Sequence, residues 1–95
     1  MFKIVEYYQN LDNTNINEEG LILKANVSSR EEAYASATRF AEDVAKNLDE
    51  LIAWNDTLVE VLGKARIDKN FDDRIIVNIP SYDEEYYAFV IEEEP

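Results

Sequence analysis

Carboxylates are the side chains of this sequence with the most obvious chemistry. The chain holds 21 Asp and Glu residues, no His and no Cys. The usual general base near neutral pH, the thiol nucleophile and the imidazole and thiolate ligands of transition metals are therefore missing. A hydrolase that uses two carboxylates needs both in a cleft of unequal polarity, whereas these acids fall in expected loops, at a helix start or on exposed faces. We expect no enzyme, no catalytic residue and no cofactor.

One stretch begins like a calcium-binding loop. Residues 68–73, DKNFDD, place Asp68, Asn70 and Asp72 at the first, third and fifth positions. The sixth and twelfth positions hold Asp and Ile, where such a loop needs Gly and a bidentate Glu. Residues 12–20, DNTNINEEG, are also rich in oxygen ligands, but their composition is typical of turns. We expect no dedicated metal site.

The C-terminal third combines tyrosine with acid. Residues 68–95 carry 9 acids and 2 bases, against 12 acids and 7 bases in residues 1–67. A tyrosine ring attracts a guanidinium group and a carboxylate accepts its paired hydrogen bonds, so this combination suits an Arg- and Lys-rich partner. Alternatively, the tyrosines only cover an open sheet face and the acids only solubilise it. The candidate partner-binding residues are Tyr82, Asp83, Glu84, Glu85, Tyr86, Glu92 and Glu93.

Composition predicts one folded domain over residues 1–95. The chain is 46% hydrophobic and 12% aromatic, well away from disordered compositions despite its net charge of −12. That charge repels nucleic acid and anionic lipid and attracts basic surfaces. With no Cys, no leader-like start and no apolar run of membrane-spanning length, we expect a cytoplasmic protein, in the host cytoplasm if it is viral, that binds neither nucleic acid nor membrane.

Two strands are predicted before the helical region. Residues 2–9, FKIVEYYQ, mix β-branched and aromatic side chains over the length of a strand, and the Asn-rich loop 11–20 follows. Residues 21–27, LILKANV, alternate with the two-residue period of a strand that buries one face. The side chains expected on that face are Leu21, Leu23, Ala25 and Val27.

Two capping boxes mark a helix start, Ser28 with Glu31 and Ser29 with Glu32, and we favour Ser29 as the cap. Apolar residues then recur at spacings of three and four, and we expect Phe40 to be buried within this stripe. We favour a break near Asn55 and a second helix over 58–62. The stripe comprises Ala33, Ala37, Phe40, Ala41, Val44, Leu48, Leu51 and Ile52.

Two more strands should follow, over 74–79 and 85–93, joined by a hairpin loop, PSYDEE, at 80–85. In the last strand Tyr87, Phe89 and Ile91 share one face. The expected order is β-β-α-α-β-β, an α+β domain with the helices packed on one face of an antiparallel sheet. The final EEEP is expected to fray.

In physical character the chain is like small acidic inhibitors that occupy the basic groove of a nucleic-acid-binding enzyme, although no motif identifies such a family. We therefore expect an inhibitor of a nuclease or of a CRISPR- or restriction-type effector, encoded by a phage or mobile element and acting as a nucleic-acid mimic. The alternative is a non-catalytic assembly protein that self-associates, as a homodimer for example, through a sheet edge or the second helix.

Overall fold

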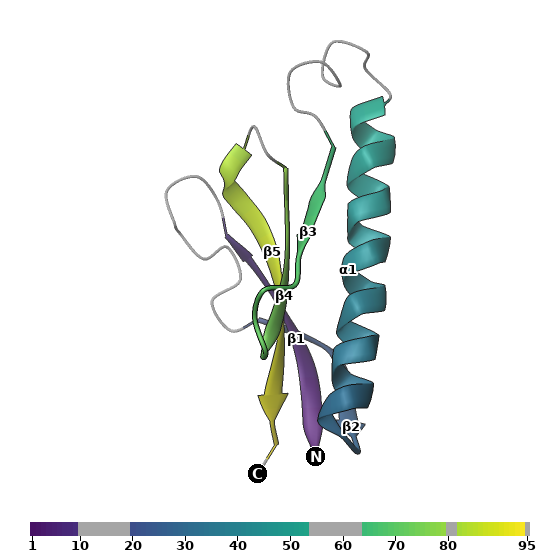
Figure 1. The fold of residues 1–95 in the computed structure, drawn as a ribbon, viewed down its shortest axis with the longest axis vertical. Helices are drawn as coiled ribbons and strands as arrows, with labels where there is room; N and C mark the ends of the chain where they lie inside the picture. The colour runs from purple at the N-terminus through teal and green to yellow at the C-terminus, as the bar shows by residue number, and fades with distance from the viewer. Residues whose placement is uncertain (10–19, 54–63, 80–81, 95) are drawn as a thin grey trace.

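The computed structural model describes residues 1–9, 20–53, 64–79 and 82–94, with the side chains of 9, 51–53, 79 and 82–86 excepted. A long helix packs along one side of a twisted sheet (Figure 1). The sheet has the strand order β2-β1-β5-β4-β3, and every neighbouring pair is antiparallel. The elements are β1 (Phe2–Gln9), β2 (Leu21–Val27), α1 (Arg30–Ala53), β3 (Arg66–Asp68), β4 (Arg74–Ile79) and β5 (Tyr82–Glu93).

The predicted α+β class is confirmed, but the predicted order of elements is not matched. Within the described ranges there is one helix, and three strands follow it instead of two. The additional strand is β3, which lies between the expected second helix and the expected strand over 74–79. The second helix over 58–62 and the break near Asn55 fall within 54–63, outside the described residues.

Helix α1 starts where its sequence predicts. The Ser29 hydroxyl accepts a hydrogen bond from the Glu32 backbone N–H at 3.1 Å, and the Ser29 carbonyl accepts the first helical bond from Ala33. Ser29 is therefore the N-cap. The Glu32 carboxylate accepts a hydrogen bond from the neighbouring Ser28 hydroxyl at 2.9 Å. The bond to the Ser29 hydroxyl satisfies a backbone donor that a helix start otherwise leaves free, whereas the bond between Ser28 and Glu32 joins two side chains.

A ridge of alanines brings α1 close to the sheet. Ala33, Ala37, Ala41 and Ala45 follow one another at four-residue spacing and are buried against the strands. Their small side chains let Phe89, Ile75, Val77 and Ile4 fill the space between the two layers, all four with no exposed surface. Phe40 lies beside this ridge and packs against the core, but it is only partly buried, so the prediction that it is buried is confirmed only in part.

The middle of the sheet is formed by β1 and β5. Their pairing is regular from Phe2↔Glu93 to Gln9↔Tyr86, and the Glu94 N–H donates to the Met1 carbonyl at 2.8 Å. Glu92, Glu93 and Glu94 are therefore held in or beside the ladder. Pro95 lies outside the described residues, and the expected fraying of the last four residues stays a prediction.

Strand β2 departs from the regular alternation that its sequence suggested. Its pairing with β1 shifts register twice, between Phe2 and Ile4 and between Ile4 and Val5. Asn26 accommodates this irregularity with a φ of 56°, a conformation that Asn tolerates better than most residues. Val27 is buried as expected and Leu23 is partly buried, but Leu21 and Ala25 are exposed.

Gly20, just before β2, is required by its surroundings. Its φ is 73°, and a Cβ at this position would clash with the side chains of Val5 and Tyr7. Both the backbone conformation and the close approach to β1 therefore favour glycine.

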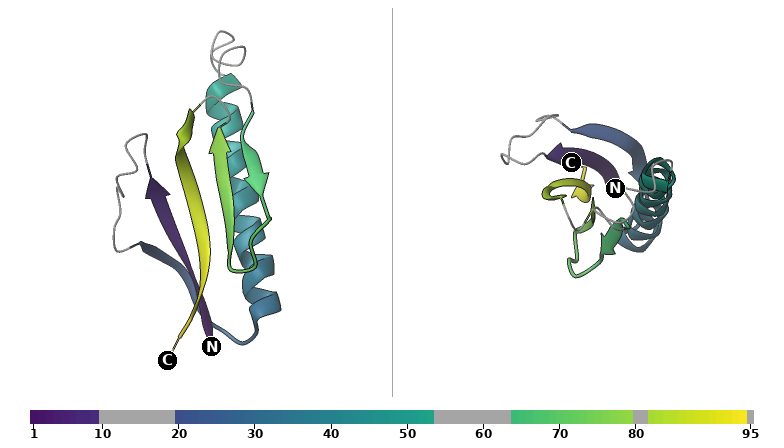
Figure 2. Two further views of the ribbon diagram at one scale, coloured as in Figure 1. Left: turned by 60° about the vertical axis from the view of Figure 1, so that its left-hand side comes forward. Right: turned by 90° about the horizontal axis from the view of Figure 1, so that it is seen from above.

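The helix contacts both edges of the sheet. The sheet curves around α1, so that β2 and β3 both lie beside it (Figure 2). At β2, Lys24 Nζ lies 3.4 Å from Ser36 Oγ. At β3, Asp49 Oδ1 accepts the Ala65 N–H at 2.8 Å and the Tyr34 hydroxyl reaches the Lys69 carbonyl at 3.5 Å. Helix side chains thus satisfy backbone groups at both ends of β3.

Replacing Asp49 by Ala should destabilise the fold by about 1–2 kcal/mol, because the Ala65 N–H then loses its acceptor. Asp49→Asn is the matched control, since it keeps an acceptor oxygen and should lose less. Urea melts of both variants provide the measurement. Equal losses would show that the carboxylate charge, rather than the hydrogen bond, stabilises this edge.

Candidate functional site

The acidic run at 83–85 lies at the start of β5. The sequence predicts a hairpin loop here, but the strand already begins at Tyr82, which pairs with Ile79. The next pair along β4 is Asn78↔Tyr86, so Asp83, Glu84 and Glu85 are interposed between two consecutive pairs and have no register partner on β4. Three consecutive acids therefore form an irregularity at one end of the sheet.

The predicted binding residues do not form one patch. Glu92 is nine residues beyond Asp83 on the same strand, which corresponds to about 30 Å at about 3.3 Å per residue. Figure 1 shows the two ends of β5 at opposite ends of the molecule. Alternation also separates Glu92 from Glu93, which lie on opposite faces of the sheet. Tyr82 to Tyr86 make one group and the two later glutamates another.

Glu92 is already engaged within the protein. Its Oε2 accepts a hydrogen bond from the Tyr7 hydroxyl at 2.7 Å, and its Oε1 lies 4.0 Å from Lys3 Nζ. The hydrogen bond to the carboxylate is the main reason why the pKa of Tyr7 is raised, with burial contributing. Since Lys3 and Glu92 also face each other in the register, this cluster ties β1 to β5 and leaves Glu92 poorly suited to a partner.

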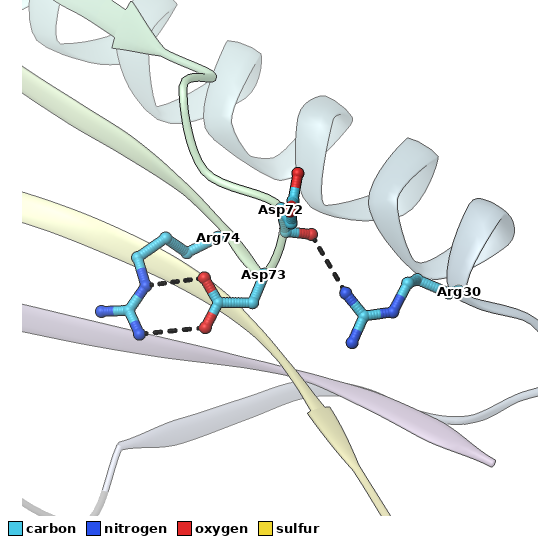
Figure 3. Close-up of polar contacts among 4 residues, drawn as sticks. All are labelled: Arg30, Asp72, Asp73 and Arg74. Carbon is cyan, nitrogen blue, oxygen red and sulfur yellow. Dashed lines mark hydrogen bonds and ion pairs between the residues drawn. The ribbon is translucent and has the colours of Figure 1, made fainter.

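A second set of charges surrounds the connection from β3 to β4 (Figure 3). Arg74 donates from Nε and one terminal nitrogen to the two oxygens of Asp73, both at 3.1 Å, and these bonds hold the pKa of Asp73 below its ordinary value. Arg30 of α1 donates to the Asp72 carbonyl at 3.3 Å, and its guanidinium lies 5.9 Å from the centre of the Phe2 ring. These contacts position the connection against the helix.

A shallow groove of about 790 Å³ runs beside this connection. The two aromatic side chains that line it are Tyr34 and Phe71, and its charges are balanced, with two bases and two acids. This groove could not be predicted from the sequence, because its walls come from α1 and from the connection after β3. The remaining lining residues are Arg30, Glu31, Lys69 and Asp72.

The two tyrosines of β1 lie on opposite faces of the sheet, as alternation requires. On β1, Tyr7 lies on the face away from α1 and Tyr8 on the face toward it. Tyr8 contacts Tyr87 on β5, with ring centres 4.7 Å apart and planes tilted by 39°. The side chains of Tyr82 and Tyr86 are outside the described part of the structure, so their role as flanking anchors stays a prediction.

The calcium-like stretch forms a turn. Asp68 belongs to β3, and its Oδ1 accepts the Asn70 N–H at 2.9 Å, as in an ordinary Asx turn. Among the side chains that the structure describes, no three acids are grouped closely enough to hold a metal ion.

Glu6 is an acid that the sequence analysis missed. It pairs with Phe89 on β5 and with Leu21 on β2, and partial burial raises its pKa above the ordinary value of 4.5. The alternation of β1 could have predicted that Glu6 is partly buried, because Glu6 falls on the same face as Phe2 and Ile4.

Glu6→Gln should therefore raise stability at pH 7. A raised carboxyl pKa means that the folded state favours the protonated form, so this contribution is present below pH 4.5 and is lost as pH rises through the folded pKa. The variant should gain less than about 1 kcal/mol at pH 7, because solvent screens a partly exposed group, and the gain should vanish near pH 4. Urea melts at both pH values test this. Lower stability of the variant at pH 7 would instead show a favourable contact of the carboxylate.

Comparisons with known proteins found no match to any family model, curated protein or solved structure. Within the described ranges, no helix has both the length and the apolar composition needed to cross a membrane. The strand order and the pairing of β4 with β5 define the class of the fold. It is an α+β fold with an acidic irregularity at one end of its sheet.

Proposed function

We propose that this protein is a non-catalytic inhibitor that binds the basic, nucleic-acid-binding surface of a nuclease or of a CRISPR- or restriction-type effector. The observation that carries the proposal is the position of Asp83, Glu84 and Glu85, interposed on β5 outside the β4 pairing. This run contributes a charge of −3 to a chain whose net charge is −12. A phage or mobile element that must evade such enzymes is the source that this activity implies.

The mechanism is replacement of phosphates by carboxylates. Acids at one end of the sheet can enter a cationic channel that binds nucleic acid. The negative field of the rest of the chain then repels nucleic acid from that channel. Association should be fast at low salt and should slow steeply as ionic strength rises, because opposite charges steer the encounter. Because Glu92 already contacts Tyr7 and Lys3 within the protein, we assign the contact with the partner to Tyr82–Tyr86.

An inhibition assay tests the proposal directly. The protein is mixed with a purified guide-RNA nuclease, a restriction enzyme or a nuclease toxin domain before the nucleic-acid substrate is added. We expect cleavage by at least one of them to fall as the protein concentration rises, and order of addition to matter. Undiminished cleavage by every enzyme at large molar excess would contradict the proposed function.

Self-association is the second candidate function, and one observation favours it. Leu21 and Ile22 of the edge strand β2 are 55% and 56% exposed. An assembly protein could bury these side chains against a second copy. Sedimentation at several salt concentrations discriminates, since a hydrophobic dimer persists at high salt, whereas charge-led binding weakens.

A further inference from the structure

The two edges of the sheet offer different surfaces to a partner. The edge strand β3 is partly closed, because Asp49 and Tyr34 of α1 bond to the backbone at its two ends. It is also basic: Lys64, Arg66 and Lys69 are all exposed on or beside it. A basic partner is therefore repelled from this edge, even though Ile67 and Phe71 are exposed nearby.

The β2 edge is less basic. It carries one basic residue, Lys24, which is exposed and whose Nζ lies 3.4 Å from Ser36 Oγ of the helix. Leu21 and Ile22 are more than half exposed, and Leu21 pairs with Glu6 on β1. Apolar side chains at a strand edge, beside a carboxylate, can contribute contacts that acids alone do not.

This apolar pair lies close to the acidic run. Leu21 and Tyr86 pair with Glu6 and Gln9, which are three residues apart on the shared neighbour β1. Leu21 and Tyr86 are thus about 10 Å apart along the strands and about 10 Å across them, and the three acids lie one to three residues beyond Tyr86. Both groups fit within one interface of standard size, about 800 Å² per partner.

We propose that Leu21 and Ile22 form the apolar half of the interface whose acidic half is Asp83–Glu85. The occupant is an extended segment of the basic partner, with apolar residues alternating with Lys or Arg, that pairs along the β2 edge. This inference rests on the proposed function, since it names the second contact of the same partner. A second copy of the chain is disfavoured as the occupant, because each copy carries a net charge of −12.

The test uses two synthetic peptides as probes, KVKVKVK and its acidic counterpart EVEVEVE, added to the isotopically labelled full chain. We expect KVKVKVK to shift the backbone amide signals of Leu21–Lys24 and of Tyr82–Tyr86, and EVEVEVE to shift neither. Shifts confined to Tyr82–Tyr86 would overturn this inference and leave the proposed function standing. No shift at either segment would contradict both this inference and the proposed function. Shifts centred on Arg66–Asp68 would assign the contact to the β3 edge and overturn this inference.

Matched variants measure the apolar contribution. Leu21→Ser with Ile22→Ser should weaken KVKVKVK binding at least about tenfold, mainly through faster dissociation. Ile67→Ser with Phe71→Ser makes the same kind of change at the β3 edge and should alter affinity less than about twofold. Equal loss from both pairs would overturn the inference, as would no loss from the first. Thermal melts check that both variants are folded, which is expected because all four side chains are exposed.

Discussion

Replacing Phe89 by Ala is expected to lower the free energy of unfolding by about 3–5 kcal/mol, enough to unfold a small domain under mild conditions. Phe89 is the largest of the fully buried side chains and belongs to the cluster that joins the sheet to the alanine ridge of α1. The substitution leaves a cavity where the ring was. The neighbours of Phe89 belong to two packed layers, so they can fill this cavity only partly. Chemical denaturation at constant pH provides the measurement.

Phe40→Ala is the matched comparison, because it removes the same side chain from a partly buried position. Its expected loss is about 1–2 kcal/mol, clearly smaller than at Phe89. A larger loss at Phe40 than at Phe89 would contradict the packing described for α1. A loss below about 1 kcal/mol at Phe89 would contradict the position of β5 at the centre of the core.

Reversal of Asp83, Glu84 and Glu85 to Lys should abolish binding to the basic partner while the fold remains intact. The substitutions change the charge by six units at one place, and like charges then meet at the interface. These residues have no register partner on β4, so we expect a change in stability of no more than about 0.5 kcal/mol for each. Association kinetics with the inhibited enzyme and thermal melts give the two measurements.

The control for this experiment follows from the structure. Glu31 and Glu32 are unsuitable, because they lie in the first turn of α1, where acids interact favourably with the helix dipole. Glu42, Asp43 and Glu50 are exposed farther along the helix, and their reversal makes the same change in net charge. Equal loss of binding from both sets would indicate a diffuse acidic coat. No loss from the β5 set would remove this segment from the functional surface.

Features governed by local sequence could be predicted. The Ser29 cap depends on a hydroxyl and on a residue three positions later, and both are visible in the sequence. Alternation likewise predicted that Phe89 and Ile91 share one face of β5, and the structure shows that this face packs against the helix. What alternation alone could not show is that Ala88 and Val90 are also buried, on the other face of a central strand.

Features that depend on distant segments could not be predicted. Strand β3 is three residues long and polar, and it is a strand because β4 and side chains from α1 supply its partners. The irregular register of β2 depends on its fit to β1. Similarly, Glu92 looked like an exposed acid until the ladder placed Lys3 opposite it. The acidic run was recognised as a candidate, but its place outside the β4 ladder was not.

The pairing of β1 with β5 also sets the order of events during synthesis. Phe2 pairs with Glu93, a partner 91 residues later in the chain. While the polypeptide is being made, β1, β2 and α1 are complete long before β5 exists, so the sheet lacks its middle strand and the alanine ridge lacks Phe89. Contacts this far apart make folding slow and leave the early strands with unpaired edges. The β1–β2 pair and α1 therefore remain incomplete folding units, which chaperones can bind, until residues 82–93 have emerged from the ribosome.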